Sequence, residues 1–97
     1  MSRCPWYISA RAVREYAAIV RRPVETEEQF ANREEELMRL VAGRRNPREQ
    51  DNGLVLWRTG RPLKLRLLVS HEPRPEGPLP QLVSVLPGPA HPVRRRT

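Results

Sequence analysis

The apolar residues of this 97-residue chain change their spacing near its middle, and this change limits the possible folds more than any other feature. Up to residue 43 they recur every three or four positions, which is the period of an amphipathic helix. From residue 54 onward the period becomes two, which is typical of a strand with one buried face. A chain of this length forms one domain, so helices and strands must share a single core, and the pattern predicts an α+β fold.

The N-terminal half predicts one short strand and two helices. Residues 6–8 are aromatic and β-branched, which favours a strand. Helical spacing of apolar residues predicts the first helix over residues 10–22. A second helix is predicted over residues 26–43, because Thr26 and Gln29 form a capping box at its start. Two amphipathic helices in succession need an apolar sheet face to cover.

The C-terminal half predicts three strands. Residues 44–52 are polar and contain an Asn-Pro pair, so we expect a loop there. The two-residue period then predicts strands over residues 54–58, 63–70 and 81–86, which pair as an antiparallel meander. The expected fold is therefore α+β in the order β-α-α-β-β-β, with the two N-terminal helices packed on one face of a small antiparallel sheet.

One compact domain is expected over residues 1–89, followed by a basic tail over residues 90–97 that we expect to be disordered. The expected core combines the apolar stripes of both helices with the inward residues of the strands. Its members are Val13, Ala17, Val20, Phe30, Leu37, Leu40, Val41, Leu56, Leu65 and Leu67. On the strand over residues 63–70 the inward residues alternate with Lys64 and Arg66, so the predicted sheet leaves a basic face open to solvent.

The composition limits the chemistry that the chain can perform. A single cysteine, Cys4, cannot form a disulfide within the chain, and only His71 and His91 could join it as metal ligands. We therefore expect neither a structural metal nor a cofactor. The N-terminus has no apolar run of signal-peptide length and no stretch is long enough for a membrane span, which predicts a cytoplasmic protein.

Arginine accounts for seventeen of the eighteen basic residues, and the net charge is +7. Arginine at this frequency, together with eleven prolines, is typical of a GC-rich genome, and proline in loops also fits a thermophilic source. The charge is uneven, because residues 1–50 carry a net charge of +2 and residues 51–97 a net charge of +5. A guanidinium keeps its charge and donates in a fixed fork, so the basic C-terminal half favours an anionic partner such as RNA.

The open face of the predicted sheet supplies the candidate site residues. The candidate ligands for a nucleic-acid backbone are the basic residues of two successive strands and their turn: Arg58, Arg61, Lys64 and Arg66. Trp57 is a candidate to stack on a base, and packing in the sheet is its alternative role. His71 follows the second of these strands and is a candidate general base, with an ordinary solvent-exposed histidine as the alternative.

One further motif lies where the predicted first strand runs into the first helix, Ile8-Ser9-Ala10-Arg11-Ala12-Val13-Arg14-Glu15-Tyr16. It resembles the opening of small toxin-like and prophage-borne proteins of the RelE/BrnT superfamily, in which a strand runs into Ser-x-His-Ala, an apolar residue and an arginine. Arg11 stands where those proteins have histidine. They also share the pattern of a strand, two helices and a meander, which covers residues 5–86 here. The resemblance implies metal-independent cleavage of RNA and an antitoxin partner.

Two functions of different classes follow. The first is a small basic RNA-directed protein, either a toxin-type metal-independent endoribonuclease or an inactive relative, with RNA or ribosome-bound message as target and an acidic antitoxin as partner. The second is a phage- or plasmid-encoded modulator that binds a host protein complex, such as RNA polymerase or a defence complex. This second function needs an exposed apolar patch or sheet edge, for which Leu68 and Leu79 are the candidates.

Overall fold

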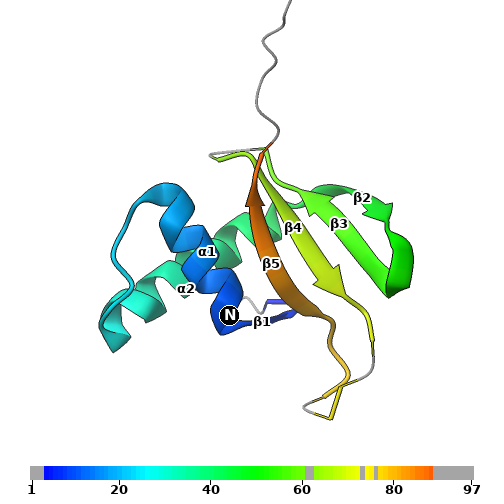
Figure 1. The fold of residues 1–97 in the computed structure, drawn as a ribbon, viewed down its shortest axis with the longest axis horizontal. Helices are drawn as coiled ribbons and strands as arrows, with labels where there is room; N and C mark the ends of the chain where they lie inside the picture. The colour runs from blue at the N-terminus through cyan, green and yellow to red at the C-terminus, as the bar shows by residue number, and fades with distance from the viewer. Residues whose placement is uncertain (1–3, 61–62, 73, 76, 89–97) are drawn as a thin grey trace, which may run out of the picture.

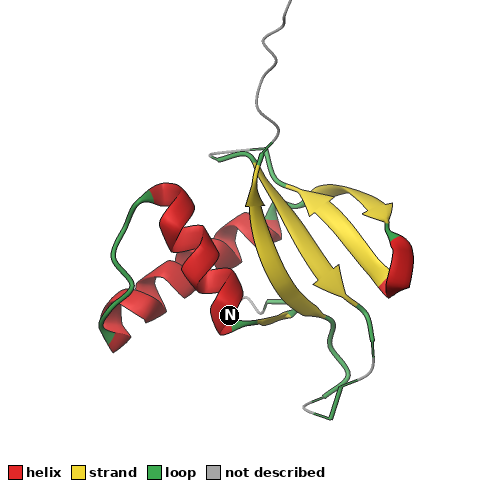
Figure 2. Cartoon of the chain, viewed as in Figure 1, coloured by secondary structure: helices red, strands yellow, loops and turns green. Residues whose placement is uncertain are grey.

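A five-stranded sheet with two helices on one side forms this protein (Figure 1). A computed structural model describes residues 4–60, 63–72, 74–75 and 77–88. Figure 2 shows both α-helices on the same side of the sheet. The predicted α+β class is therefore confirmed. The predicted site residue Arg61 and the predicted tail lie outside the described residues.

The elements follow one another along the chain in the order β-α-α-β-β-β-β. They are β1 (Tyr7–Ile8), α1 (Ala10–Val20), α2 (Glu27–Ala42), β2 (Arg45–Glu49), β3 (Leu54–Arg58), β4 (Leu65–Ser70) and β5 (Gln81–Pro87). A short 3-10 turn, η1 (Asp51–Gly53), joins β2 to β3. Within the sheet the strands lie in the order β1-β5-β4-β3-β2.

The sheet is mixed, which corrects the predicted antiparallel sheet and its β-α-α-β-β-β order. β1 pairs with β5 in parallel, with Tyr7 opposite Gln81 and Ile8 opposite Leu82, whereas the other neighbouring strands are antiparallel. The Tyr7 N–H donates to the carbonyl oxygen of Pro80 at 2.8 Å. β4 pairs with one edge of β5, so β1 pairs with the opposite edge. β1 runs in the same direction as β5, which makes this pair parallel.

β2 corrects the loop predicted over residues 44–52. Pro47 lacks the N–H that a central strand needs, but β2 is an edge strand of the sheet, where proline is tolerated. Its pairing with β3 also contains a bulge between Arg45 and Arg48, within which Asn46 has a left-handed φ of 58°. The Asn-Pro pair therefore belongs to a bulged edge strand instead of a turn.

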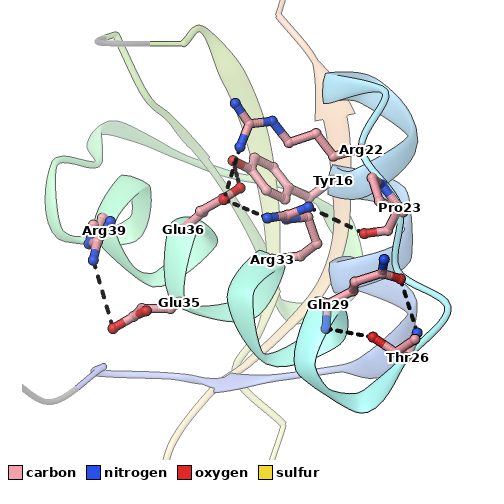
Figure 3. Close-up of polar contacts among 9 residues, drawn as sticks. All are labelled: Tyr16, Arg22, Pro23, Thr26, Gln29, Arg33, Glu35, Glu36 and Arg39. Atoms are coloured by element: carbon pink, nitrogen blue, oxygen red, sulfur yellow. Dashed lines mark hydrogen bonds and ion pairs between the residues drawn. The ribbon is translucent and has the colours of Figure 1, made fainter.

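Both helices begin at a hydroxyl side chain that acts as N-cap, and the cap of α2 is the one that the sequence predicts. The Ser9 side chain accepts a hydrogen bond from the Ala12 N–H at 3.0 Å and starts α1. Thr26 and Gln29 form the capping box that starts α2, as Figure 3 shows. α1 stops before its predicted end, because Arg21 adopts a left-handed φ of 58° and closes the helix.

One core lies between the helices and the sheet. Its buried members are Trp6, Ala12, Val13, Tyr16, Leu37, Leu40, Val41, Leu65, Leu67, Val69, Leu82 and Val85. Both helices therefore contribute to the same core, and β4 meets it with Leu65 and Leu67, as predicted. The predicted core residues Val20 and Phe30 are only partly buried against it.

Leu56 corrects one part of the predicted core. It pairs with Leu68 across β3 and β4, on the face of the sheet that points away from the helices. Its neighbour Trp57 pairs with Leu67 instead and is partly buried against the core. Successive strand residues point to opposite faces, so when Trp57 faces the helices, Leu56 cannot.

A carboxylate joins α1 to the edge of β5. Glu15 Oε1 accepts hydrogen bonds from the Val85 N–H at 2.9 Å and from the Ser84 hydroxyl at 2.8 Å, while Oε2 pairs with Arg11 at 3.1 Å. Partial burial acts to raise the pKa of Glu15, but these hydrogen bonds and the Arg11 charge outweigh it and hold the pKa below its usual value. The part of the β5 edge that β1 does not reach is therefore closed by α1.

Truncation of Leu65 should cost far more stability than truncation of its neighbour Lys64. Leu65 is 1% exposed, whereas Lys64 lies at the surface. We expect Leu65→Ala to lower the free energy of unfolding by about 2–5 kcal/mol and Lys64→Ala by about 0.5 kcal/mol or less. Thermal or urea melts of both variants measure the difference, and equal losses would contradict the one-sided burial of β4.

Candidate nucleic-acid interface

The face of the sheet that points away from the helices, here called the open face, carries a row of arginines. Directly paired residues of neighbouring strands point to the same face. Arg45 on β2 pairs with Arg58 on β3, and Arg58 pairs with Arg66 on β4. Since Leu65 and Leu67 point into the core, Arg66 and its paired neighbours point the other way. These three residues, the arginine row, place one cation on each of three adjacent strands.

A second row lies beside the arginine row and is mainly apolar. Arg48 on β2 pairs with Leu56 on β3, which pairs with Leu68 on β4. Both leucines are half-buried, and Arg48 is exposed. Two residues along a strand separate the two rows, which corresponds to about 7 Å. The open face therefore combines the arginine row with two neighbouring leucines, Leu56 and Leu68, here called the leucine shelf.

A hollow of about 250 Å³ lies at the end of the sheet where β3 leads into β4. Its lining residues are Arg45, Asn46, Arg58, Thr59, Gly60, Lys64 and Leu65. Basic residues from three places in the sequence thus line one hollow, and no carboxylate is among the lining residues. We call it the cationic hollow.

Thr59 holds the backbone around the cationic hollow. Its N–H donates to the carbonyl oxygen of Leu65 at 3.0 Å, and its hydroxyl accepts from the Leu65 N–H at 3.0 Å. The same hydroxyl donates to the carbonyl oxygen of Leu63 at 2.6 Å. Because these bonds tie the end of β3 to the start of β4, they set the relative positions of Arg58 and Lys64.

The cations of the open face have no carboxylate partner among the described residues. Ion pairs lie in the helical layer instead: Arg11–Glu15, Arg22–Glu36, Arg33–Glu36 and Arg39–Glu35. Arg66 is anchored by Nε, which donates to the carbonyl oxygen of Pro87 at 3.0 Å. Like charges on directly paired residues destabilise a sheet. An anion placed over the arginine row would relieve this repulsion.

Three of the predicted phosphate ligands, Arg58, Lys64 and Arg66, lie on or beside the open face, and the structure brings the first two to one hollow. Arg61 lies outside the described residues. Sequence reasoning missed Arg45, because its segment reads as a loop. The only local sign that Arg45 belongs to a strand is weak: Pro47, two residues later, is compatible with a strand at the edge of a sheet.

Trp57 lies on the helix-facing side of the sheet, away from the arginine row. Its ring centroid is 5.8 Å from that of Trp6. The Arg44 guanidinium lies over both rings, 4.8 Å from the Trp6 centroid and 4.9 Å from the Trp57 centroid. The structure therefore gives Trp57 a packing role, in which it joins the N-terminal segment to β3.

His71 lies at the opposite end of β4 from the cationic hollow. Five residues along the chain separate it from Arg66, which corresponds to about 16 Å of extended strand. It lines a separate hollow of about 470 Å³, to which Glu49 and Gly53 also contribute. Its N–H donates to the carbonyl oxygen of Gly53 at 3.4 Å. The structure therefore does not bring His71 together with the predicted phosphate ligands.

A larger hollow of about 620 Å³ lies on the helical side of the molecule. Its lining residues are Tyr16, Val20, Arg22, Glu36, Arg39, Leu40 and Leu63. Figure 3 shows the polar cluster at this hollow, in which the Tyr16 hydroxyl donates to Glu36 Oε1 at 3.0 Å. Glu36 Oε2 accepts from Arg33 at 2.9 Å and from Arg22 at 3.3 Å. Because this carboxylate already pairs with both arginines, the hollow is a poorer site for an anion than the cationic hollow.

The Tyr16–Glu36 pair joins the two helices and is not poised for proton transfer. Burial and the neighbouring Glu36 carboxylate raise the pKa of Tyr16 to about 12. Burial acts to raise the pKa of Glu36, but hydrogen bonds from Tyr16 and Arg33 and the arginine charges hold that pKa below its usual value. At neutral pH the proton therefore stays on Tyr16 and the negative charge on Glu36.

Glu36→Gln should destabilise the protein in a pH-dependent way. Because the pKa of Glu36 is lowered on folding, its ionised form adds stability above pH 4.5, and that stability is lost as the pH falls through the folded-state pKa. We expect a loss of about 1–3 kcal/mol at pH 7 and a smaller loss at acid pH, since Arg33 is buried and needs this partner.

Glu35→Gln is the matched control, because Glu35 lies next to Glu36 on α2 and pairs with Arg39 at the surface at 3.7 Å. Its substitution should change the free energy of unfolding by about 0.5 kcal/mol or less. Urea melts over a range of pH compare the two variants. A loss for Glu36→Gln that does not change with pH would contradict the role of the ionised carboxylate.

Metal-binding clusters, membrane-spanning helices and similarity to known proteins also bear on function. The described ranges hold no group of three or more His, Cys, Asp or Glu side chains that could bind a metal ion. A helix with the length and apolar character to cross a membrane is not found in that part of the chain either. Comparison of the chain with protein-family models, curated proteins and solved structures found no match. The RelE/BrnT resemblance therefore stays a prediction from the sequence.

Proposed function

We propose that the open face of the sheet binds RNA through its phosphates. The observation that carries this proposal is the cationic hollow, to which Arg45, Arg58 and Lys64 contribute without a carboxylate among the lining residues. Arg48 and Arg66 extend the positive surface over the adjoining parts of β2 and β4. Guanidinium groups stay charged and donate to phosphate oxygens in a fixed fork, so this surface suits a polyanion.

The distribution of charge along the chain supports the same face. Seven of the eleven carboxylates belong to residues 15–36, which form most of the helical layer. Residues 45–72, which include three of the strands, carry six basic and three acidic side chains. A nucleic-acid strand approaching the protein is therefore attracted to the sheet more strongly than to the helices.

The arrangement supports binding of RNA more than its cleavage. Metal-independent cleavage needs a general acid and a general base beside the reacting phosphate. The lining residues of the cationic hollow include no histidine, carboxylate or tyrosine, and His71 lies about 16 Å farther along the strand from Arg66. Among the alternatives that the sequence leaves open, we therefore propose the inactive, RNA-binding relative.

A protein partner is the second candidate, and the leucine shelf is the observation that favours it. The two leucines of the shelf, Leu56 and Leu68, are half-buried on the open face, as is Leu54 two residues before Leu56 on β3. Arginines lie beside them. An acidic partner with apolar side chains, such as an antitoxin or part of a host complex, could use both kinds of contact. RNA is preferred because the cations gather in a hollow at the end of the sheet, beyond the leucines.

Two triple variants with the same net charge test the proposal. The sheet variant is Arg58→Gln, Lys64→Gln and Arg66→Gln, and the control variant is Arg94→Gln, Arg95→Gln and Arg96→Gln. Fluorescence anisotropy with one labelled single-stranded RNA measures affinity over a range of salt. We expect the sheet variant to lose at least about tenfold in affinity at low salt and the control less than about threefold. The slope of log affinity against log salt should fall by about 2 for the sheet variant, because each phosphate contact contributes about 0.7.

Equal losses of RNA affinity in the two variants would mean that net charge alone determines the binding, which would contradict the proposal. Absence of RNA binding by the wild-type protein at low salt would also contradict it and would favour the protein partner. Circular dichroism and thermal melts show whether each variant remains folded.

A further inference from the structure

The cationic hollow lies at one end of the positive surface, and we propose that it holds the terminal phosphate of a bound RNA strand. This inference rests on the proposed RNA binding. It adds a preference for strands that end in a phosphate monoester over strands that end in hydroxyl groups.

A terminal phosphate differs from the phosphates inside a strand in charge and in the number of free oxygens. A phosphate monoester carries about 1.5 to 2 negative charges at pH 7 and presents three acceptor oxygens. An internal phosphodiester carries a single negative charge and has fewer free oxygens. Arg45, Arg58 and Lys64 line the hollow, and a monoester bound there offers one oxygen to each of these three side chains.

The position of the hollow also fits the end of a strand. Arg66 and Arg48 continue the positive surface from the hollow across the open face. The remaining lining residues of the hollow are uncharged: Asn46, Thr59, Gly60 and Leu65. Among the described residues, Arg48 and Arg66 therefore lie on the side of the hollow toward the open face. A strand with its end in the hollow can follow these two cations across the open face.

Gly60 leaves room for the Arg45 side chain beside the hollow. A Cβ atom at position 60 would collide with Arg45 Nη2 and would lie 3.2 Å from Arg45 Cζ. Because these atoms belong to the end of a flexible side chain, Gly60→Ala should displace the guanidinium and leave the backbone in place. The substitution changes no charge, so it tests the position of Arg45 separately from the net charge.

Anisotropy titrations of one short single-stranded RNA with three kinds of end test the inference: a 5′-phosphate, a 3′-phosphate, or hydroxyls at both ends. We expect one phosphorylated form to bind the wild-type protein about tenfold tighter than the hydroxyl form, as an added charge-assisted hydrogen bond provides. Gly60→Ala should abolish this advantage. Gly43→Ala is the matched control and should retain it, because its Cβ would lie 3.8 Å from the Leu40 carbonyl oxygen, an ordinary contact.

Equal binding of the three RNAs by the wild-type protein would overturn the inference and leave the proposed RNA binding intact, whereas failure of every RNA to bind would overturn both. An advantage that survives in Gly60→Ala and in Arg45→Gln would also overturn it, because the phosphate would then lie elsewhere. If Gly60→Ala melts well below the wild type, Arg45→Gln serves as the test in its place. Inorganic phosphate should compete with the phosphorylated RNA and leave the hydroxyl form bound, and equal competition with both forms would contradict the inference.

Discussion

The contact between α1 and β5 decides which surface of this protein is open. The Glu15 carboxylate binds the Val85 N–H and the Ser84 hydroxyl, so the helix closes the edge of the strand while its apolar residues enter the core. α2 adds Leu37 and Val41 to the same core. Both helices therefore cover one face of the sheet. The opposite face, which bears the arginine row, has no helix over it in the described part of the chain.

Charge is distributed differently in the two layers. In the helical layer Glu36 pairs with Arg33 within α2 and accepts a hydrogen bond from Tyr16, which joins the two helices (Figure 3). On the sheet, direct pairing of the arginine row brings like charges together, and no carboxylate among the described residues neutralises them. Like charges on directly paired residues lower the stability of a sheet. Departures from the most stable arrangement are expected where a surface has a function, and this departure supports the choice of the open face as the anion-binding surface.

The parts of the fold that depend on nearby residues could be predicted from the sequence, and the parts that depend on distant partners could not. The apolar spacing of the helices, the capping box of α2 and the alternation along β4 are local, so the helices and the positions of Lys64 and Arg66 follow from them. β2 does not follow, because Pro47 fits a strand only at the edge of a sheet and nothing local places it there. Arg45 was missed for the same reason. Trp57 belongs to a run of apolar residues in β3, so only the pairing with β4 decides which of them face the core.

The central claim is that the open face of the sheet, and not the helical layer, binds anionic strands. Amide-resolved NMR of isotope-labelled protein, titrated with a short single-stranded RNA, tests this claim residue by residue. The largest shifts are predicted at residues 45, 46, 48, 56–60 and 64–66, with small changes along α1 and α2. Largest shifts on the two helices, or uniform small shifts over the whole chain, would contradict the account.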